Sequence, residues 1–367
     1  MKLLLLNQFG PATGAPTGRI LAELGAALEQ KGHQIHFLAT DSSYGKPSRG
    51  RERILREGLS HLRLIWRGLR LPKVDAVISL TSPACLAVTA GFIARLHRAQ
   101  HFHWAMDLYP DVGVRLGELK ESPLTRFLSF LMRRAYRSAT QVVTLDDDMR
   151  DYVQDRYGAS SIVLEPFPPD MVWPTIDAKP GPMKRWLYSG NFGRAHEIRI
   201  LLEIQQQLEA RQIPAELILQ GQGPQFQASR DVAASLGLRQ VQWRSPVPLE
   251  KLGESLREAD VLVVTRKAEM KGLLLPSKLM LAEHSGRPIL WIGDTDGKTA
   301  QRLVRARRHG VFTCEAIAPI AAWLQDAFSS TAPLSSLAPR STSLVREETL
   351  HRWETLLQQG RPVRPSL

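Results

Sequence analysis

The sequence predicts an α/β protein built from two doubly wound domains, each a parallel sheet with helices on both faces. Short buried apolar runs alternate with amphipathic helical segments along almost the whole chain, as βαβ units require. This alternation is interrupted once, where six prolines fall within residues 165–182, a composition typical of an interdomain linker. At 367 residues the chain is long for one core and suits two domains.

The first domain is expected over residues 1–168. Its strands are the apolar runs, and most of its helices are bounded by proline, aspartate, glycine or serine. The expected strands are 3–6, 34–39, 76–80, 102–106 and 141–145. The expected helices are 18–31, a basic one within 49–73, 83–99 with Ser82 as its N-cap, 123–138, and one that begins at Asp147.

The same rhythm continues in a second domain, expected over 183–342 after a linker at 169–182, with a C-terminal helix and tail at 343–367. The expected strands are 186–189, 215–220, 241–243, 261–265 and 289–292. The expected helices are 197–210, 225–236, 249–259, one from Pro276-Ser277-Lys278 to Ser285-Gly286, 298–308 and 343–359. Two such domains face each other across a cleft at the carboxyl ends of their strands, where ligands bind in open α/β folds.

Composition limits the class of protein. The two cysteines make no disulfide framework and no zinc-binding spacing, which fits a reducing cytoplasm. The apolar run after Met1-Lys2 is too short for a signal peptide. The uncharged stretch 76–94 contains Thr81-Ser82-Pro83 in its middle, so we expect a strand and a helix there and no transmembrane segment.

Positive charge is concentrated in one segment. Residues 49–73 contain eight Lys or Arg and two Glu, a net of +6 out of the chain's +12. Apolar residues recur there at helical spacing, which predicts a basic amphipathic helix; they are Leu55, Leu59, Leu62, Ile65, Trp66 and Leu69. Such a helix suits an anionic membrane surface. The alternative is a solvated helix that packs one face on its own domain. Nucleic acid is disfavoured because no aromatic platform accompanies the charge.

The segment 271–294 contains the first candidate site. Lys271 and Gly272 lead into Pro276-Ser277-Lys278, where a hydroxyl and an ammonium meet at a helix start. Such a start, with loop N–H groups beside it, can bind an anion such as phosphate. It could equally be an ordinary capped helix, because Ser is a common N-cap.

Two glycine-rich turns lie upstream of that segment. In the first, Gly190 and Gly193 let the backbone approach a bulky anion, and Arg194 can bind phosphate oxygens through two hydrogen bonds. The second turn holds Gly221 and Gly223, which could bring backbone groups to the edge of a base. Taken singly, each could be no more than a strand-to-helix turn.

Together these blocks resemble the nucleotide-sugar domain of a family 4 glycosyltransferase of the GT-B fold, which is built from two Rossmann-like domains. The matching blocks are SGNFGR, LILQGQGP and LPSKLMLAEHSGRPIL, in that order. The N-terminal half is similar too, through Asn7-Gln8-Phe9 with Pro11 and the Gly14–Gly18 loop, and through WAMDLYPD followed by Leu116-Gly117. The resemblance covers nearly the whole chain and is nearest to bacterial enzymes that build polyprenyl-linked surface polysaccharides.

The resemblance implies that a sugar is transferred from a nucleoside diphosphate sugar, a UDP-sugar being favoured, to a lipid-linked or saccharide acceptor. It implies retention of configuration and no cofactor or metal, because cations stabilise the leaving diphosphate. The residues carried over to the donor site are Gly190, Asn191, Gly193, Arg194, Arg199, Gly221, Gly223, Gly272, Ser277 and Lys278. Arg199 stands where many members have lysine, and the two cations differ in reach.

On the acceptor side the resemblance implies Gly14, Gly18 and Asp111, with Asp107 as the residue that contacts or deprotonates the acceptor hydroxyl. Asp107 could instead cap a helix after its strand. The sequence also departs from the family, because Leu273 and Leu281 occupy positions where two glutamates are common. The sequence therefore lacks the acids that contact the ribose and the donor sugar in many members of the family.

Two clusters imitate metal sites. Asp146-Asp147-Asp148 follows a strand and opens a helix, where carboxylates favour the N-terminal dipole, so a helix start is preferred to a metal motif. His97, His101 and His103 lack a matched carboxylate signature and are expected to be structural.

The function expected from the sequence is that of a cytoplasmic glycosyltransferase, peripheral on the inner face of the cytoplasmic membrane. Its other expected partners are the nucleotide sugar and its acceptor. A nucleotide-sugar epimerase of the same architecture is one alternative, which the basic helix disfavours. A non-catalytic nucleotide-binding subunit is the other, which the missing glutamate pair keeps open.

Overall fold

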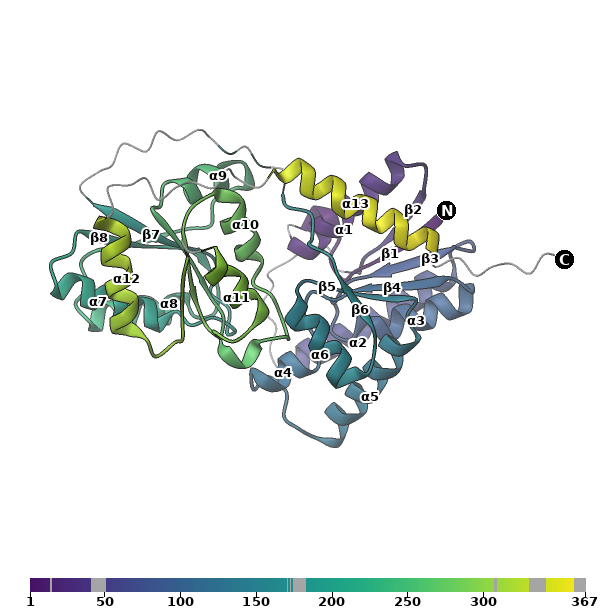
Figure 1. Cartoon of the computed structure of the whole chain (residues 1–367). Helices are drawn as coiled ribbons and strands as arrows, with labels where there is room; N and C mark the ends of the chain where they lie inside the picture. The colour runs from purple at the N-terminus through teal and green to yellow at the C-terminus, as the bar shows by residue number, and fades with distance from the viewer. Residues whose placement is uncertain are drawn as a thin grey trace. The chain divides into compact units, whose positions relative to one another are not determined.

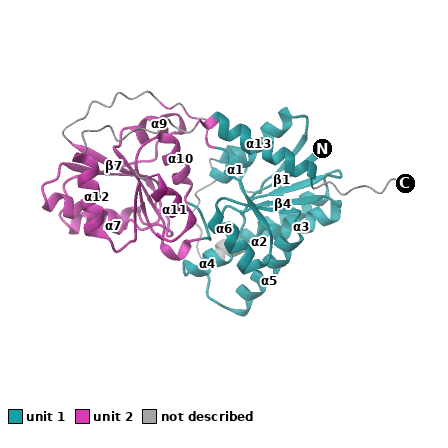
Figure 2. Cartoon of the chain, in the orientation of Figure 1, with its two compact units in different colours: residues 1–167, 272–275, 343–367 teal, residues 168–271, 276–342 magenta. Residues whose placement is uncertain are grey.

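The computed structural model describes residues 1–13, 15–40, 51–169, 171, 173, 183–306, 309–329 and 341–359, with only the backbone of residues 51–54. Gly14, most of the expected linker and the tail from 360 lie outside the described residues. The contacts divide the chain into two compact units (Figure 2). Unit 1 consists of Met1–Phe167, Gly272–Leu275 and Ser343–Leu367, and unit 2 of Pro168–Lys271 and Pro276–Thr342.

Unit 1 is built on a six-stranded, wholly parallel sheet with strand order β2-β1-β3-β4-β5-β6 (Figure 1). Its strands are β1 (Lys2–Leu6), β2 (Gln34–Leu38), β3 (Ala76–Ser79), β4 (Gln100–Trp104), β5 (Gln141–Thr144) and β6 (Ser161–Val163). Side chains alternate across the sheet, so Leu3 and Leu5 of β1 enter one core while Leu4 and Leu6 enter another. Both faces are therefore buried, as the continuous apolar run in β1 predicts.

The helices of unit 1 cover the two faces. They are η1 (Pro11–Thr13), α1 (Pro16–Gln30), α2 (Arg51–Leu69), α3 (Leu86–His97), α4 (Asp111–Arg115), α5 (Pro123–Ser138), α6 (Asp147–Tyr157) and α13 (Thr342–Gln359). On one face, α1 and α13 share a core with Leu3 and Leu5; there Trp353 packs edge-on against Trp104, with ring centroids 5.2 Å apart. On the other face, α2 and α3 share a core with Leu4 and Leu6. The C-terminal helix thus completes the first unit.

Unit 2 repeats the design with strand order β12-β11-β10-β7-β8-β9, again wholly parallel. Its strands are β7 (Lys184–Asn191), β8 (Ala215–Gln222), β9 (Val241–Arg244), β10 (Val261–Thr265), β11 (Ile289–Ile292) and β12 (Gly310–Phe312). The chain runs outward from β7 to β9 and then returns to β10 on the other side of β7. The strand order therefore reverses between β7 and β10, which is where ligands bind in such sheets.

The helices of unit 2 are α7 (Arg199–Ala210), α8 (Phe226–Ser235), α9 (Leu249–Arg257), η2 (Ala268–Met270), α10 (Ser277–Ser285), α11 (Lys298–Arg305) and α12 (Ile317–Ser329). The apolar faces of α7 and α12 bury the same side of the sheet. α10 ends at Gly286, whose φ of +75° is the left-handed conformation that commonly terminates a helix. The expected boundaries of this helix and of the β11 strand are confirmed.

Some expected elements need correction. The helix expected at 83–99 begins only at Leu86, after a loop that includes a cis Ser82–Pro83 bond. The Ser82 carbonyl accepts a hydrogen bond from the Gln8 N–H at 2.6 Å, so the end of β1 holds this loop in place of a helical turn. The sequence also did not predict β6, β12, α4 and α12. The two strands are only three residues long, too short for a clear period.

The basic helix α2 turns its apolar stripe outward. Leu64 is its buried contact with the core, and Gly68 packs against Ile93 of α3. Five of the six residues of the sequence-derived stripe are exposed, Leu62 by 64% and Trp66 by 55% among them. Packing of that stripe on its own domain is therefore ruled out for these five residues. No helix in the described part of the chain has the length and apolar content to cross a bilayer.

Candidate functional site

The site in unit 2 begins with two glycine turns at the ends of neighbouring strands. Gly190 of β7 pairs with Gly221 of β8, and their φ values are +145° and +143°. A Cβ atom on Gly221 would lie 1.9 Å from the Gly190 carbonyl oxygen, and one on Gly223 would lie 2.4 Å from the Asn191 Oδ1. Only glycine fits at Gly221 and Gly223, so the two strand ends approach more closely than side chains allow.

Lys278 lies over the first of these turns. It is the second residue of α10, and its Nζ donates a hydrogen bond to the Tyr188 hydroxyl and lies 3.7 Å from the centroid of that ring. A Cβ on Gly190 would lie 3.2 Å from the Lys278 Cε, so this glycine leaves room for the lysine stem. Burial lowers the pKa of the Lys278 ammonium well below its ordinary value. An anion beside it would restore the charged form, because an opposite charge favours it.

Tyr188 joins this lysine to the loop that follows β7. Its hydroxyl donates to the Asn191 carbonyl at 2.7 Å while it accepts from Lys278, so both roles of the hydroxyl are used. Gln225 Nε2 donates to the Gly193 carbonyl at 2.5 Å and to the His196 carbonyl at 3.2 Å. The loop is therefore held from two sides, in a fixed position beside Lys278.

His196 connects the loop to the strand across the reversal point. Its Nδ1 lies 2.6 Å from the carbonyl oxygen of Thr265, the last residue of β10. Burial and the nearby Lys278 lower the pKa of the imidazole to about 3. Tyr188, His196, Gln225 and Thr265 were not predicted as site residues from the sequence. Only the position of Thr265 at the carboxyl end of an expected strand could have indicated it.

The other residues predicted for the donor site differ in the ion pairs and hydrogen bonds that they form. Arg194 is exposed and makes no ion pair or hydrogen bond within the described part of the chain. Arg199, the first residue of α7, is exposed and pairs with Glu203 at 2.8 Å. Ser277 is exposed at the first position of α10; Pro276 is the N-cap, so no side chain caps this helix. The ordinary Ser-capped helix is therefore wrong.

Gly272 has surroundings that the sequence did not predict. Its segment, Gly272–Leu275, belongs to unit 1, and a Cβ on Gly272 would lie 3.0 Å from the Asp148 carbonyl oxygen of α6. Leu273, which replaces an expected acid, is buried there, and its carbonyl accepts from the Leu108 N–H at 2.9 Å. Gly272 therefore has a packing role on α6, and we leave it out of the donor site.

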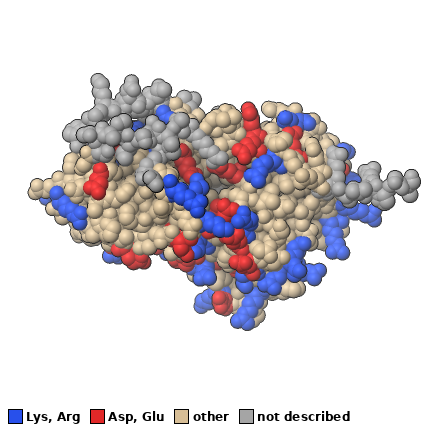
Figure 3. Space-filling view, viewed as in Figure 1, with Lys and Arg blue, Asp and Glu red and all other residues tan. Residues whose placement is uncertain are grey.

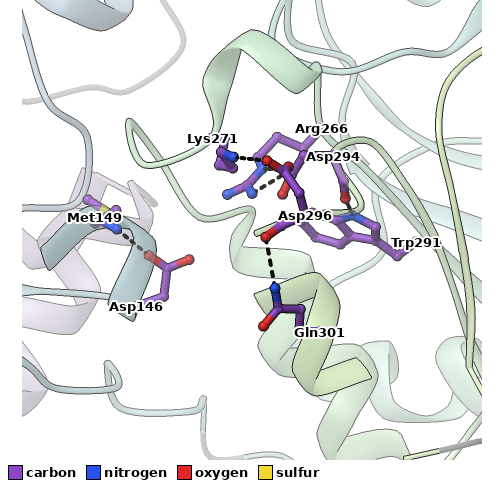
Figure 4. Close-up of polar contacts among 8 residues, drawn as sticks. All are labelled: Asp146, Met149, Arg266, Lys271, Trp291, Asp294, Asp296 and Gln301. Carbon is purple, nitrogen blue, oxygen red and sulfur yellow. Dashed lines mark hydrogen bonds and ion pairs between the residues drawn. The ribbon is translucent and has the colours of Figure 1, made fainter. Parts of the chain in front are cut away.

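Charged pairs surround the end of β10 (Figure 4). Arg266, fully buried, donates from Nη2 to Asp294 Oδ1 at 2.6 Å, with Trp291 stacked near its guanidinium. Lys271 pairs with Asp296 at 2.6 Å, and its hydrogen bond lowers the pKa of that carboxyl. Neither carboxylate was predicted from the sequence. The buried pair fixes the segment between β11 and α11 against the strand end that holds His196.

In unit 1, Asp107 lies beyond the end of β4 and is half-buried. Its backbone forms an isolated antiparallel bridge with Leu274. The carboxylate has no ion pair or hydrogen bond to a side chain among the described residues, and burial raises its pKa to about 6. It is not a helix cap, because Pro110 occupies that position for α4. A carboxyl group with such a pKa can exchange a proton near neutral pH.

The remaining acceptor-side residues have structural surroundings. Asp111 is buried and accepts hydrogen bonds from the Tyr157 hydroxyl at 2.8 Å, the Tyr152 hydroxyl at 3.1 Å and Arg156 Nε at 3.2 Å. Gly18, in the first turn of α1, lies so close to the preceding loop that a Cβ would be 2.6 Å from the Gly10 carbonyl oxygen. Because its carboxylate is bonded within unit 1, we leave Asp111 out of the proposed acceptor site.

The two metal-like clusters have other roles. Asp146 is the N-cap of α6, and its Oδ1 accepts from the Met149 N–H at 2.8 Å (Figure 4), which confirms the helix start. His101 and His103 are buried and share the Ser79 hydroxyl, at 3.2 and 2.9 Å; burial lowers both pKa values. His97 lies 2.9 Å from the Gly68 carbonyl oxygen. Within the described residues, no three His, Cys, Asp or Glu side chains are grouped as metal ligands would be.

Comparison with known proteins identifies the first unit. Residues 17–170 match the model of the glycosyl transferase 4-like domain. The chain carries a family 4 glycosyltransferase domain. It is also similar to the probable glycosyltransferase WbjE of Pseudomonas aeruginosa, with 28% identity over 258 residues, which is 66% of this chain. The chain spans 62% of the length of that relative.

Solved structures show that the GT-B fold extends over both units of this chain. WaaG, a glycosyltransferase involved in lipopolysaccharide biosynthesis, superposes with a TM-score of 0.65 at 16% identity, covering 98% of each chain. Anabaena HepE, in complex with UDP and glucose, gives 0.65 at 13% identity, covering 98% of each chain. At these identities the likeness concerns the fold, and the chemistry depends on the residues described above.

Proposed function

We propose that the protein transfers a sugar from a nucleoside diphosphate sugar to a lipid-linked or saccharide acceptor in the synthesis of a bacterial surface polysaccharide. The observation that carries this proposal is Lys278, held against Tyr188 over the Gly190 turn at the reversal point of a doubly wound sheet. There a partly buried ammonium, a close-packed glycine backbone and the exposed Arg194 can together bind a diphosphate.

The reaction follows from the groups present. The bond between the anomeric carbon and the diphosphate oxygen breaks, and the acceptor hydroxyl oxygen forms the new bond to that carbon. Lys278 and Arg194 offset the charge that develops on the departing diphosphate, a task that metal ions perform in other transferases. Asp107 receives the proton of the acceptor hydroxyl. We propose that configuration is retained and that no metal or other cofactor is needed.

The comparisons support the substrate classes. WaaG acts in lipopolysaccharide biosynthesis, and HepE binds UDP and glucose. A UDP-sugar is therefore the first donor to test. Because the family model covers residues 17–170 only, the donor side depends on the geometry of unit 2.

We propose that unit 1 binds the cytoplasmic surface of an anionic membrane. Beside the outward stripe of α2, its neighbour α3 and helix α5, which packs on α3, also expose large apolar residues, which are Phe92, Leu96, Leu124, Phe127 and Phe130. Helix α5 carries four arginines and no acidic residue. Figure 3 shows Lys and Arg gathered over the part of unit 1 where Figure 1 places α3 and α5. Exposed apolar groups among cations are what an anionic bilayer interface attracts.

The test is release of UDP from a panel of UDP-sugars, measured with and without a membrane extract as the source of acceptor. We expect release that depends on the extract, that persists in EDTA, and that the Arg194→Ala variant largely loses. UDP binding without turnover would favour a non-catalytic subunit. Conversion of one UDP-sugar into another without an acceptor would favour an epimerase.

A further inference from the structure

The tautomer of the His196 ring is determined by the backbone carbonyl that the ring contacts. Its Nδ1 lies 2.6 Å from the Thr265 carbonyl oxygen, which can only accept a hydrogen bond. Nδ1 must therefore carry the proton, and in a neutral ring the other nitrogen, Nε2, then presents a lone pair. The loop position is held as well, because Gln225 donates to the His196 carbonyl and the His196 N–H donates to the Gly193 carbonyl.

The surroundings keep the ring neutral. Burial and the charge of Lys278 both disfavour an imidazolium. The ring lies edge-on to Tyr188, with centroids 6.1 Å apart, so the tyrosine face adds no charge. Among the described residues, Nε2 has no hydrogen-bond partner, and it is not among the atoms closed off from solvent. A ligand at the turn can therefore reach it.

This lone pair differs from the groups proposed to bind the diphosphate. Lys278, Arg194 and the loop N–H groups are all donors, which suits phosphate oxygens. A neutral Nε2 can only accept, so it cannot bond to an ionised phosphate and needs a donor such as a hydroxyl. The acids that would bind hydroxyls are replaced here by Leu273 and Leu281.

We propose that His196 Nε2 accepts a hydrogen bond from a hydroxyl of the nucleotide sugar and so helps to select the donor. This inference rests on the proposed function. Because His196 lies beside the Gly190–Gly193 turn, the hydroxyl that it contacts would lie next to the diphosphate. That hydroxyl belongs either to the transferred sugar or to the ribose. The two sources share one chemistry, and the ligands used in the test separate them.

Two variants isolate this bond. In His196→Asn the amide N–H can replace Nδ1–H on the Thr265 carbonyl, but nothing reaches the position of Nε2. In His196→Gln the longer side chain can place an acceptor near that position. Calorimetric titration with UDP, 2′-deoxy-UDP and a panel of UDP-sugars measures affinity, and thermal unfolding confirms that each variant is folded.

We expect His196→Asn to weaken UDP-sugar binding about threefold to tenfold, the scale of one hydrogen bond, and His196→Gln to weaken it less. A loss seen with UDP-sugars but not with UDP assigns the hydroxyl to the sugar. A loss seen with UDP but not with 2′-deoxy-UDP assigns it to the ribose. Unchanged affinity for all ligands in a folded His196→Asn protein would overturn the inference.

A second measurement needs no variant. Nitrogen chemical shifts of His196 should show the neutral ring with its proton on Nδ1, and a proton on Nε2 would contradict the inference. If the wild-type protein binds no UDP-sugar in the panel, the proposed function itself fails in its UDP form, and this inference fails with it. If the wild type binds UDP-sugars and the His196 variants bind them with the same affinity, only the inference about His196 is wrong.

Discussion

At the scale of single residues, each unit holds a candidate site residue that is ionisable, partly out of water and without an opposite charge beside it. In unit 2 this is Lys278, whose described partner is a phenol, and in unit 1 it is Asp107. A folded protein gains nothing in stability from such groups, since desolvation disfavours their charged forms. Ionisable groups that are partly buried without an opposite charge are therefore candidates for ligand binding or catalysis.

Replacing Lys278 tests the diphosphate site. We expect Lys278→Ala to weaken UDP binding by about 1.5–3 kcal/mol, the value of a hydrogen bond to a charged group. Isothermal titration calorimetry measures the difference. The matched control is Lys251→Ala, because Lys251 is an exposed lysine of α9 in the same unit. Equal affinity in both variants would remove Lys278 from the site.

The raised pKa of Asp107 makes a prediction about stability. Because its folded pKa of about 6 exceeds the model value of 3.8, the folded state holds more protons than the unfolded state between these values. Wild-type stability therefore falls as the pH rises through this window. Because the Asp107→Asn side chain cannot ionise, this variant should have a higher melting temperature than the wild type at pH 8. Below pH 4 the two melting temperatures should be equal. The variant should also lose transfer activity.

The control for Asp107 is Asp111. Removing its buried carboxylate leaves the Tyr157 hydroxyl without its partner, so Asp111→Ala should lower the melting temperature at both pH values. An Asp107→Asn protein no more stable than the wild type at pH 8 would show that its carboxylate is better solvated than the structure indicates.

At the scale of elements, the paired ends of β7 and β8 form the close-packed base of the donor site. Three glycines with φ near +145° lie there, at Gly190, Gly221 and Gly223. Side chains are excluded from this backbone conformation, so the strand ends can meet and Lys278 can lie across them. The start of α10 contributes its second residue to the same place.

The close approach of the ends of β7 and β8 can be tested by adding one methyl group. Gly221→Ala should destabilise the protein by about 3 kcal/mol or more, because a Cβ would lie 1.9 Å from the Gly190 carbonyl oxygen in a conformation that alanine avoids. Gly237→Ala is the matched control: its φ is +67°, but nothing lies within 4 Å, so only about 1–2 kcal/mol is expected. Denaturant unfolding measures both. Equal losses would refute the close approach of the strands.

At the scale of the whole molecule, positive charge is concentrated in segments of unit 1 that could bind an anionic membrane surface. Half of the net charge of +12 comes from residues 49–73, and α5 adds further arginines without acids. Arg63, Arg67 and Arg70 are exposed on and just after α2, near the outward stripe, and the Arg70 guanidinium lies 3.5 Å from the Trp66 ring centroid. An aromatic ring with cations beside it favours the headgroup region of a bilayer.

Removing this charge should release the protein from membranes. With Arg63, Arg67 and Arg70 changed to Gln, we expect a loss of about 1 kcal/mol of binding per arginine on anionic vesicles. Sedimentation with vesicles that contain phosphatidylserine measures it. The control makes the same charge change on unit 2, at the exposed Arg211, Arg230 and Arg239. Equal loss in both would show that only net charge matters.

Much of the fold could be predicted from the sequence because it depends on local patterns. The apolar runs of β1, β10 and β11 and the proline, glycine and aspartate at helix ends are local signals, and they give the two α/β units. The candidate site was predicted only in part. Lys278 and the glycine turns have sequence signals, whereas Tyr188, His196 and Thr265 meet only because strands far apart in the chain are neighbours.

By itself, the sequence determined the two α/β units, the glycine turns and the basic segment, because residue type and spacing are enough to specify them. Only the tertiary structure decided that Gly272 and Asp111 pack in unit 1, that the stripe of α2 faces outward and that His196 presents an acceptor. Burial, hydrogen-bond partners and tautomers depend on which strands become neighbours, and no local pattern encodes that.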